Sequence, residues 1–157
     1  MRYTPGQLRD AAGLTKEAFR HWRKVLPGFP SGNGHGPCFL PGDVLASAVL
    51  NQMIRGCGVR VGQLTEVSQE IFDVCNLTPW EELSEHVLVV ELGSEARVTV
   101  AKRSHVLGDS TVVLCPMAPI IAKLSIDLIQ PLPAAADQAR KRAASYEYQL
   151  TVDGRDR

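Results

Sequence analysis

Basic side chains are concentrated near the start of the chain, in a stretch that also carries regularly spaced apolar residues. Counting His21, the five are Lys16, Arg20, His21, Arg23 and Lys24. Phe19, Trp22 and Leu26 recur through the same stretch at the spacing of one helical face. A helix here buries its aromatic face and projects cations from the other. Ammonium and guanidinium groups donate hydrogen bonds and accept none, which suits them to anions such as phosphate.

The charges of the chain are segregated, although they sum to zero. Residues 1–60 hold eight Lys or Arg against three acids, a net charge of +5. Residues 61–100 have a net charge of −7, and the remainder has a net charge of +2. The basic first third favours an anionic partner. The alternative is a basic face that is merely solvated, as most charge runs are.

Two short helices must position the basic residues. Thr4 is a suitable N-cap, Pro5 occupies the first helical position, and Gly13 ends the helix. Thr15 then caps a second helix that runs through about Lys24. Two such helices across a tight turn predict a helix-turn-helix.

The following segments predict a connection and two more helices. Residues 27–43 contain five glycines and four prolines, which indicates a loop or a short two-stranded wing. A third helix is expected from near Asp43, which lies favourably at the positive end of the helix dipole. Its mostly apolar face comprises Val44, Leu45, Ala48, Val49, Gln52 and Met53. Residues 59–75 predict a fourth helix, with Val61, Leu64, Val67, Ile71 and Val74 at helical spacing.

The carboxyl-terminal half predicts a small α+β module. Three β-rich runs, Val87 to Leu92, Ala96 to Lys102 and Ser110 to Cys115, are separated by turn residues and suggest an antiparallel β-meander. Residues 118–129 follow as an amphipathic helix that ends before the prolines at 131 and 133. The apolar runs of residues 86–129 could pair two chains, through sheet edges or the helix face of Ile121, Leu124 and Leu128. They could equally form the core of one chain.

Residues 3–24, the Gly-rich stretch and residues 39–64 together resemble the MerR-type winged helix-turn-helix DNA-binding domain. Phe19-Arg20-His21-Trp22 matches the family's Arg followed by aromatics. Residues 39–44 match the end of its wing and its Asp-led helix, and residues 56–64 match its Gly-containing turn. Two features depart from the family. The wing offers only Asn33 and His35 in place of arginines, and no long dimerisation helix follows.

The resemblance implies a double-stranded DNA partner and a recognition helix. Thr15, Lys16, Glu17 and Arg20 are the candidates for reading bases, because Arg pairs with guanine and Glu accepts from cytosine. His21, Arg23 and Lys24 are assigned to phosphates, with weaker contacts from the wing. The full set of expected DNA-binding residues is Thr15, Lys16, Glu17, Arg20, His21, Arg23, Lys24, Asn33 and His35. A homodimer is expected because symmetric sites present successive major grooves about 34 Å apart.

The chain as a whole is expected to be α+β in three parts. Residues 1–76 form the winged-helix domain, residues 77–131 a dimerisation, partner or ligand module, and residues 132–157 a flexible tail. The tail's basic triplet, residues 140–142, is interpreted as solvated. No membrane helix or secretory signal is recognised, so we expect a cytoplasmic, nucleoid-associated protein.

No catalytic or metal chemistry is predicted, and no cofactor. Ser104, His105 and Asp109 invite a triad interpretation, but triad members converge in space rather than in sequence. Cys38, Cys57, Cys75 and Cys115 lack zinc-site spacing and are interpreted as reduced, mostly buried thiols. His35 with Cys38 lacks a second ligand pair. Glu81, Glu82 and Glu85 are interpreted as a solvated acidic edge.

These observations favour a non-enzymatic, sequence-specific transcription regulator that acts as a dimer on operator DNA. An excisionase-like architectural factor that bends DNA is the nearest alternative, since the same winged helix also serves such factors. An adaptor that binds proteins through a winged-helix fold is the alternative from another class. It predicts that replacing Lys16 and Arg20 leaves activity unchanged. The sequence assigns no effector.

Overall fold

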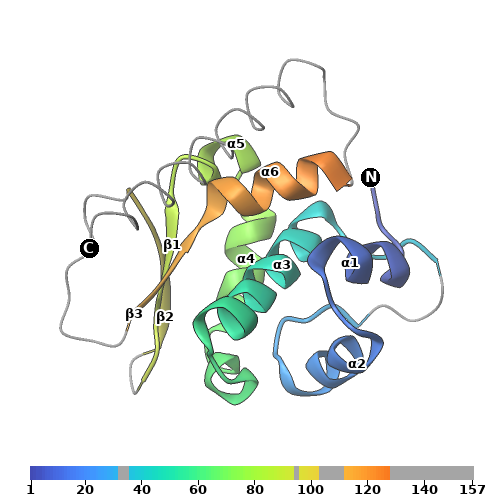
Figure 1. Ribbon diagram of the computed structural model, residues 1–157, viewed down its shortest axis with the longest axis horizontal. Coiled ribbons are helices and arrows are strands. Elements are labelled where there is room, and N and C mark those ends of the chain that lie inside the picture. The colour runs from blue at the N-terminus through green and yellow to red at the C-terminus, as the bar shows by residue number, and fades with distance from the viewer. Residues whose placement is uncertain (32–35, 94–95, 103–111, 128–157) are drawn as a thin grey trace, which may run out of the picture.

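The structure is a computed structural model that describes residues 1–31, 36–93, 96–102 and 112–127 of the chain. Its elements in chain order are α1 (Pro5–Ala12), α2 (Lys16–Val25), α3 (Pro41–Cys57), the 3-10 helix η1 (Val61–Leu64), α4 (Ser68–Leu77), α5 (Trp80–Leu83), β1 (Val87–Glu91), β2 (Arg97–Ala101), β3 (Val112–Pro116) and α6 (Met117–Asp127). The described residues therefore form a mixed α+β fold, as predicted. The helices lie to one side of a three-stranded sheet (Figure 1).

The first helix begins and ends as its sequence predicts. The Thr4 hydroxyl accepts from the Gln7 N–H at 3.2 Å, and the Gln7 side chain accepts from the Thr4 N–H at 2.9 Å. These two bonds satisfy donors that a helix start leaves unpaired. Gly13 ends the helix at a φ of 68°, a left-handed conformation that disfavours other residues.

The second helix also follows its prediction. The Thr15 hydroxyl accepts from the Ala18 N–H at 3.1 Å, which caps the first turn of α2. Phe19, Trp22 and Leu26 are buried with exposed fractions of 6%, 3% and 4%. The predicted aromatic and apolar face therefore packs on the body of the protein.

The described part of the segment between α2 and α3 pairs with the amino terminus. Tyr3 and Phe39 form an isolated antiparallel bridge, with N–H to O distances of 2.8 and 3.0 Å. Residues 26–31 and 36–40 form no hairpin with each other. In these residues the loop interpretation holds, and the wing remains a prediction.

The third helix starts two residues earlier than expected, at Pro41. Asp43 lies in the first turn of α3, as expected, and its side chain is also buried, at 5% exposure. One carboxylate oxygen accepts from the Leu40 N–H at 2.7 Å and the other from the Asn76 amide at 2.9 Å. These bonds compensate the carboxylate for its loss of water. The expected apolar face was wrong at Gln52, which is exposed.

The prediction of one continuous helix over residues 59–75 was wrong. A 3-10 helix spans Val61–Leu64, and α4 begins only at Ser68. Side-chain bonds favour the interruption, because the Gln63 amide oxygen accepts from the Arg60 N–H at 3.0 Å. Leu64 is fully buried in the interrupted form, so the apolar spacing alone did not reveal the break. The short helix α5 was also missed.

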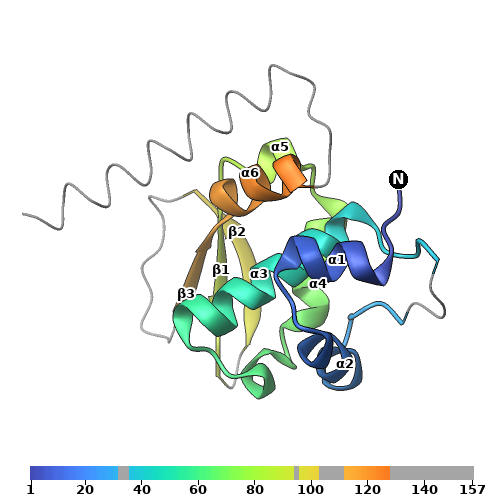
Figure 2. The ribbon, with the colours of Figure 1, turned by 45° about the vertical axis from the view of Figure 1, so that its right-hand side comes forward.

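The sheet is antiparallel, but it is not a meander. Its strand order is β2-β1-β3, so β1 lies in the centre and β3 pairs with β1 rather than with β2. Val87 is opposite Ala101 on one side and Pro116 on the other. The first four residues of β1 are all buried, which a central strand provides more readily than an edge strand. Figure 2 shows the sheet and α6 from a second side.

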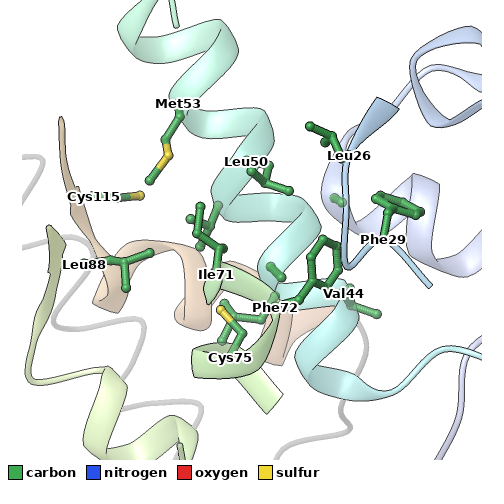
Figure 3. Close-up of a cluster of buried hydrophobic side chains, with 14 of the residues drawn as sticks. Leu26, Phe29, Val44, Leu50, Met53, Ile71, Phe72, Cys75, Leu88 and Cys115 are labelled. Atoms are coloured by element: carbon green, nitrogen blue, oxygen red, sulfur yellow. The ribbon is translucent and has the colours of Figure 1, made fainter. Parts of the chain in front are cut away.

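One hydrophobic core joins the helices to the sheet. Met53 of α3 and Ile71 of α4 share it with Leu88 of β1 and Cys115 of β3 (Figure 3). Buried side chains therefore lie on both sides of the predicted boundary at residue 76. Ile121 and Leu124 of α6 are buried in the same core, at 8% and 1% exposure. For these two side chains the structure favours the second alternative, in which they form the core of one chain, and Leu128 lies outside the described residues.

Candidate nucleic-acid interface

The outward face of α2, with its N-cap, carries the predicted contact residues. All seven of them that the structure describes are exposed: Thr15, Lys16, Glu17, Arg20, His21, Arg23 and Lys24. Figure 1 shows α2 at the far side of the helices from the sheet. The local sequence accounts for this face, because the buried positions 19, 22 and 26 leave the intervening polar positions outside. The other two predicted residues, Asn33 and His35, lie outside the described residues.

Aromatic packing holds the inner face of α2. The ring of Phe19 lies edge-on to Phe29 and Phe39, with centroid distances of 5.5 and 6.0 Å. Trp22 also packs on Phe29, and Phe29 packs on Phe72 of α4 at 5.4 Å. Edge-to-face pairs add to the free energy of simple burial. The charged face is therefore mounted on a connected set of rings.

Uncompensated positive charge marks this helix. Its four Lys and Arg side chains outnumber its one acid, Glu17. Within the described ranges, no ion pair or hydrogen bond engages the side chains of Lys16, Arg20 or Lys24. The Arg23 guanidinium lies 5.7 Å from the centre of the Phe19 ring. Most of this charge is therefore available to a partner.

Two polar side chains that the sequence analysis did not single out contact the ends of α2. The Asn51 amide donates to the backbone oxygens of Ala12 and Gly13, in the turn before α2. The Ser68 hydroxyl donates to the backbone oxygen of Pro27, just after α2. The only available signal was a polar residue within an apolar pattern, and that signal does not identify its partner.

The remaining titratable candidates do not converge on a second site. In the described part of the chain, no group of three or more His, Cys, Asp or Glu residues could hold a metal ion. The four cysteines are free thiols, as expected, but Cys38 is half-buried and Cys57 is exposed, so two of the four rather than most are buried. Ser104, His105 and Asp109 lie outside the described residues. Glu81, Glu82 and Glu85 are exposed, as expected.

Comparison of the sequence with models of protein families and with curated proteins finds no match. The fold and the site therefore define the class: a mixed α+β protein that displays one basic, aromatic-backed helix. None of the helices in the described residues is long and apolar enough to cross a membrane.

Proposed function

We propose that this protein is a non-enzymatic, sequence-specific DNA-binding regulator of transcription, and that α2 is its recognition helix. One observation carries the proposal. The helix buries Phe19 and Trp22 while every described candidate contact on it is exposed, with three cations that no described group engages. A recognition helix needs such a division, because one face packs while the other enters the major groove.

The order of side chains along α2 suits the two kinds of DNA contact. Lys16, Glu17 and Arg20 lie towards its amino-terminal end, which reads base edges in helix-turn-helix proteins. Arg20 can pair with a guanine through two hydrogen bonds. Thr15 caps the helix by accepting one hydrogen bond at its hydroxyl oxygen, and its hydroxyl proton is still able to donate to DNA. His21, Arg23 and Lys24 follow and suit phosphates, whose neutralisation releases counterions.

A homodimer is part of the proposal, because two recognition helices read a symmetric site. The edge of β2 is blocked, since the Val98 N–H donates to the Glu70 carboxylate at 2.9 Å. Val90 of β1 lies opposite Val98, and its N–H points away from β2 towards β3, where Val90 pairs with Val113. N–H groups alternate in direction along a strand. The Leu114 N–H then points outward, and no group in the described residues bonds it. The β3 edge is thus the better candidate for pairing two chains.

The test is selection and sequencing of genomic DNA fragments that the purified protein retains at physiological salt. We expect the native protein to recover an inverted repeat and Arg20→Ala to lose it. Lys123→Ala removes another exposed positive charge, from α6, so it is the matched control and should retain selection. Circular dichroism establishes that each variant is folded.

Two results would redirect the proposal. Retention of one bent fragment class without a repeat supports an excisionase-like architectural factor. Recovery of nothing, or of unrelated fragments equally by the native protein and Arg20→Ala, refutes DNA reading through α2. It would support the protein-binding adaptor.

A further inference from the structure

The turn that leads into α2 is tied to α3 by one side chain. The Asn51 amide nitrogen lies 2.9 Å from the Ala12 oxygen and 3.3 Å from the Gly13 oxygen. These carbonyls belong to the end of α1, where the helix leaves acceptors without partners. Thr15, the N-cap of α2, comes two residues later. Asn51 therefore holds the backbone at the point where the direction of α2 is set.

The other end of α2 is tied to α4 in the same manner. Ser68 is fully buried, and its hydroxyl donates to the Pro27 oxygen at 2.7 Å. The adjacent Gly28 has a φ of 78°, and a Cβ there would lie 2.7 Å from the Gln69 Cα. Glycine thus permits the chain leaving α2 to approach the start of α4 closely.

The two ties differ in kind from the aromatic packing. Buried rings determine which face of α2 turns inward, and the hydrophobic effect that favours their burial is not directional. A hydrogen bond prefers an angle above about 150° and weakens steeply below about 120°. The two bonds from Asn51 at one end and the one from Ser68 at the other come from different helices of the core, and together they restrict the tilt of α2.

We propose that Asn51 and Ser68 are positioning residues that fix the orientation of α2 and thereby its sequence preference. This inference rests on the proposed function, in which α2 reads bases. Neither side chain needs to touch DNA. Phosphate attraction is long-ranged and survives a small tilt, whereas a two-bond contact from Arg20 to guanine depends on alignment. Loss of either tie should therefore lower selectivity more than it lowers general DNA affinity.

The experiment measures dissociation constants for the selected sequence and for unrelated DNA, at a temperature where each variant is folded. Selectivity is the dissociation constant for unrelated DNA divided by that for the selected sequence. We expect Asn51→Ala and Ser68→Ala each to reduce this ratio by about tenfold, the size of one lost base contact. The slope of affinity against salt should stay unchanged, because no cation is removed.

The matched control is Ser47→Ala. Ser47 is fully buried, and its hydroxyl donates to the backbone oxygen of Asp43 at 2.7 Å, a bond that stays within α3. Its loss removes a buried hydroxyl of the same kind, so it reports the effect of reduced stability alone. The ratio of dissociation constants should remain that of the native protein.

A second measurement does not depend on DNA. Hydrogen exchange of the α2 amides, such as that of Phe19, should be faster by roughly tenfold in Asn51→Ala and Ser68→Ala than in Ser47→Ala. If exchange responds while the native protein selects no sequence, the positioning role stands and the proposed function fails. If the native protein selects a sequence and the two variants match Ser47→Ala in both measurements, the positioning role is refuted.

Discussion

Two buried thiols predict that the protein loses stability as the solution becomes alkaline. Burial raises the pKa of Cys75 from 9.0 to about 12, with smaller contributions from Cys115 and Asp43. Burial likewise raises the pKa of Cys115 to about 12, with a smaller contribution from Cys57. Both thiols lie in the core that joins the helices to the sheet (Figure 3). The folded protein therefore holds them as neutral groups well above pH 9.

The sign and size of the effect follow from proton linkage. In the unfolded chain both thiols ionise near their ordinary pKa of 9.0. Their contribution to stability is fully present below that pH and is lost as the pH rises towards 12. One pH unit above the unfolded pKa, each thiol lowers the free energy of unfolding by about 1.4 kcal/mol. The pair should thus remove almost 3 kcal/mol at pH 10, a large share of the roughly 5–15 kcal/mol typical of a domain.

The assay is urea unfolding at pH 8 and pH 10 in the presence of a reductant. Cys75→Ala also leaves a cavity, but the difference between the two pH values within one variant cancels that effect. The decline in the free energy of unfolding should be about 1.4 kcal/mol smaller in Cys75→Ala than in the native protein. Cys57 is exposed, so Cys57→Ala should decline as the native protein does. Equal declines in the native protein and Cys75→Ala would refute the argument.

Two further predictions concern the α3 and α4 contact and the α2 surface. A Cβ at Gly42 would meet the Asn76 side chain and lie 2.6 Å from the Cys75 oxygen, so Gly42→Ala should lower the free energy of unfolding by about 1–3 kcal/mol. Gly6→Ala, whose Cβ meets nothing closer than 3.8 Å, is the control in the same denaturation experiment. Lys24→Ala should lower the slope of log affinity for DNA against log salt by about 0.9 if that side chain contacts a phosphate. The measurement is a DNA titration at several salt concentrations. A slope for Lys24→Ala equal to that of the native protein would contradict this contact.

Local signals predicted the amino-terminal helices well. Thr4 and Thr15 cap their helices through bonds that span three residues, and Gly13 stops α1 through its own backbone conformation. Such interactions are complete within one helical turn, so the sequence contains both partners side by side. The exposure of the candidate DNA contacts followed in turn from the spacing of the buried residues.

The strand order could not be predicted in the same way. The three β-rich runs were predicted to within two residues at each end, but the predicted meander was wrong. Consecutive strands usually pair, as β1 and β2 do. β3 instead pairs with β1, which places the buried strand β1 in the centre of the sheet. Glu70 then covers the outer edge of β2 from a helix 28 residues earlier in the chain. No periodicity in the sequence records that bond.

Polar residues inside the fold explain the remaining errors, and they bear on function. Patterns assign polar side chains to solvent, yet Asp43 and Ser68 are buried because each meets a partner far away in the sequence. The composition of α2 identifies the side chains that we propose to contact DNA. The direction in which they point depends on Asn51 and Ser68, which lie on other helices. The α2 sequence therefore supplies the chemistry of the proposed contacts, while their alignment depends on the polar bonds of the body.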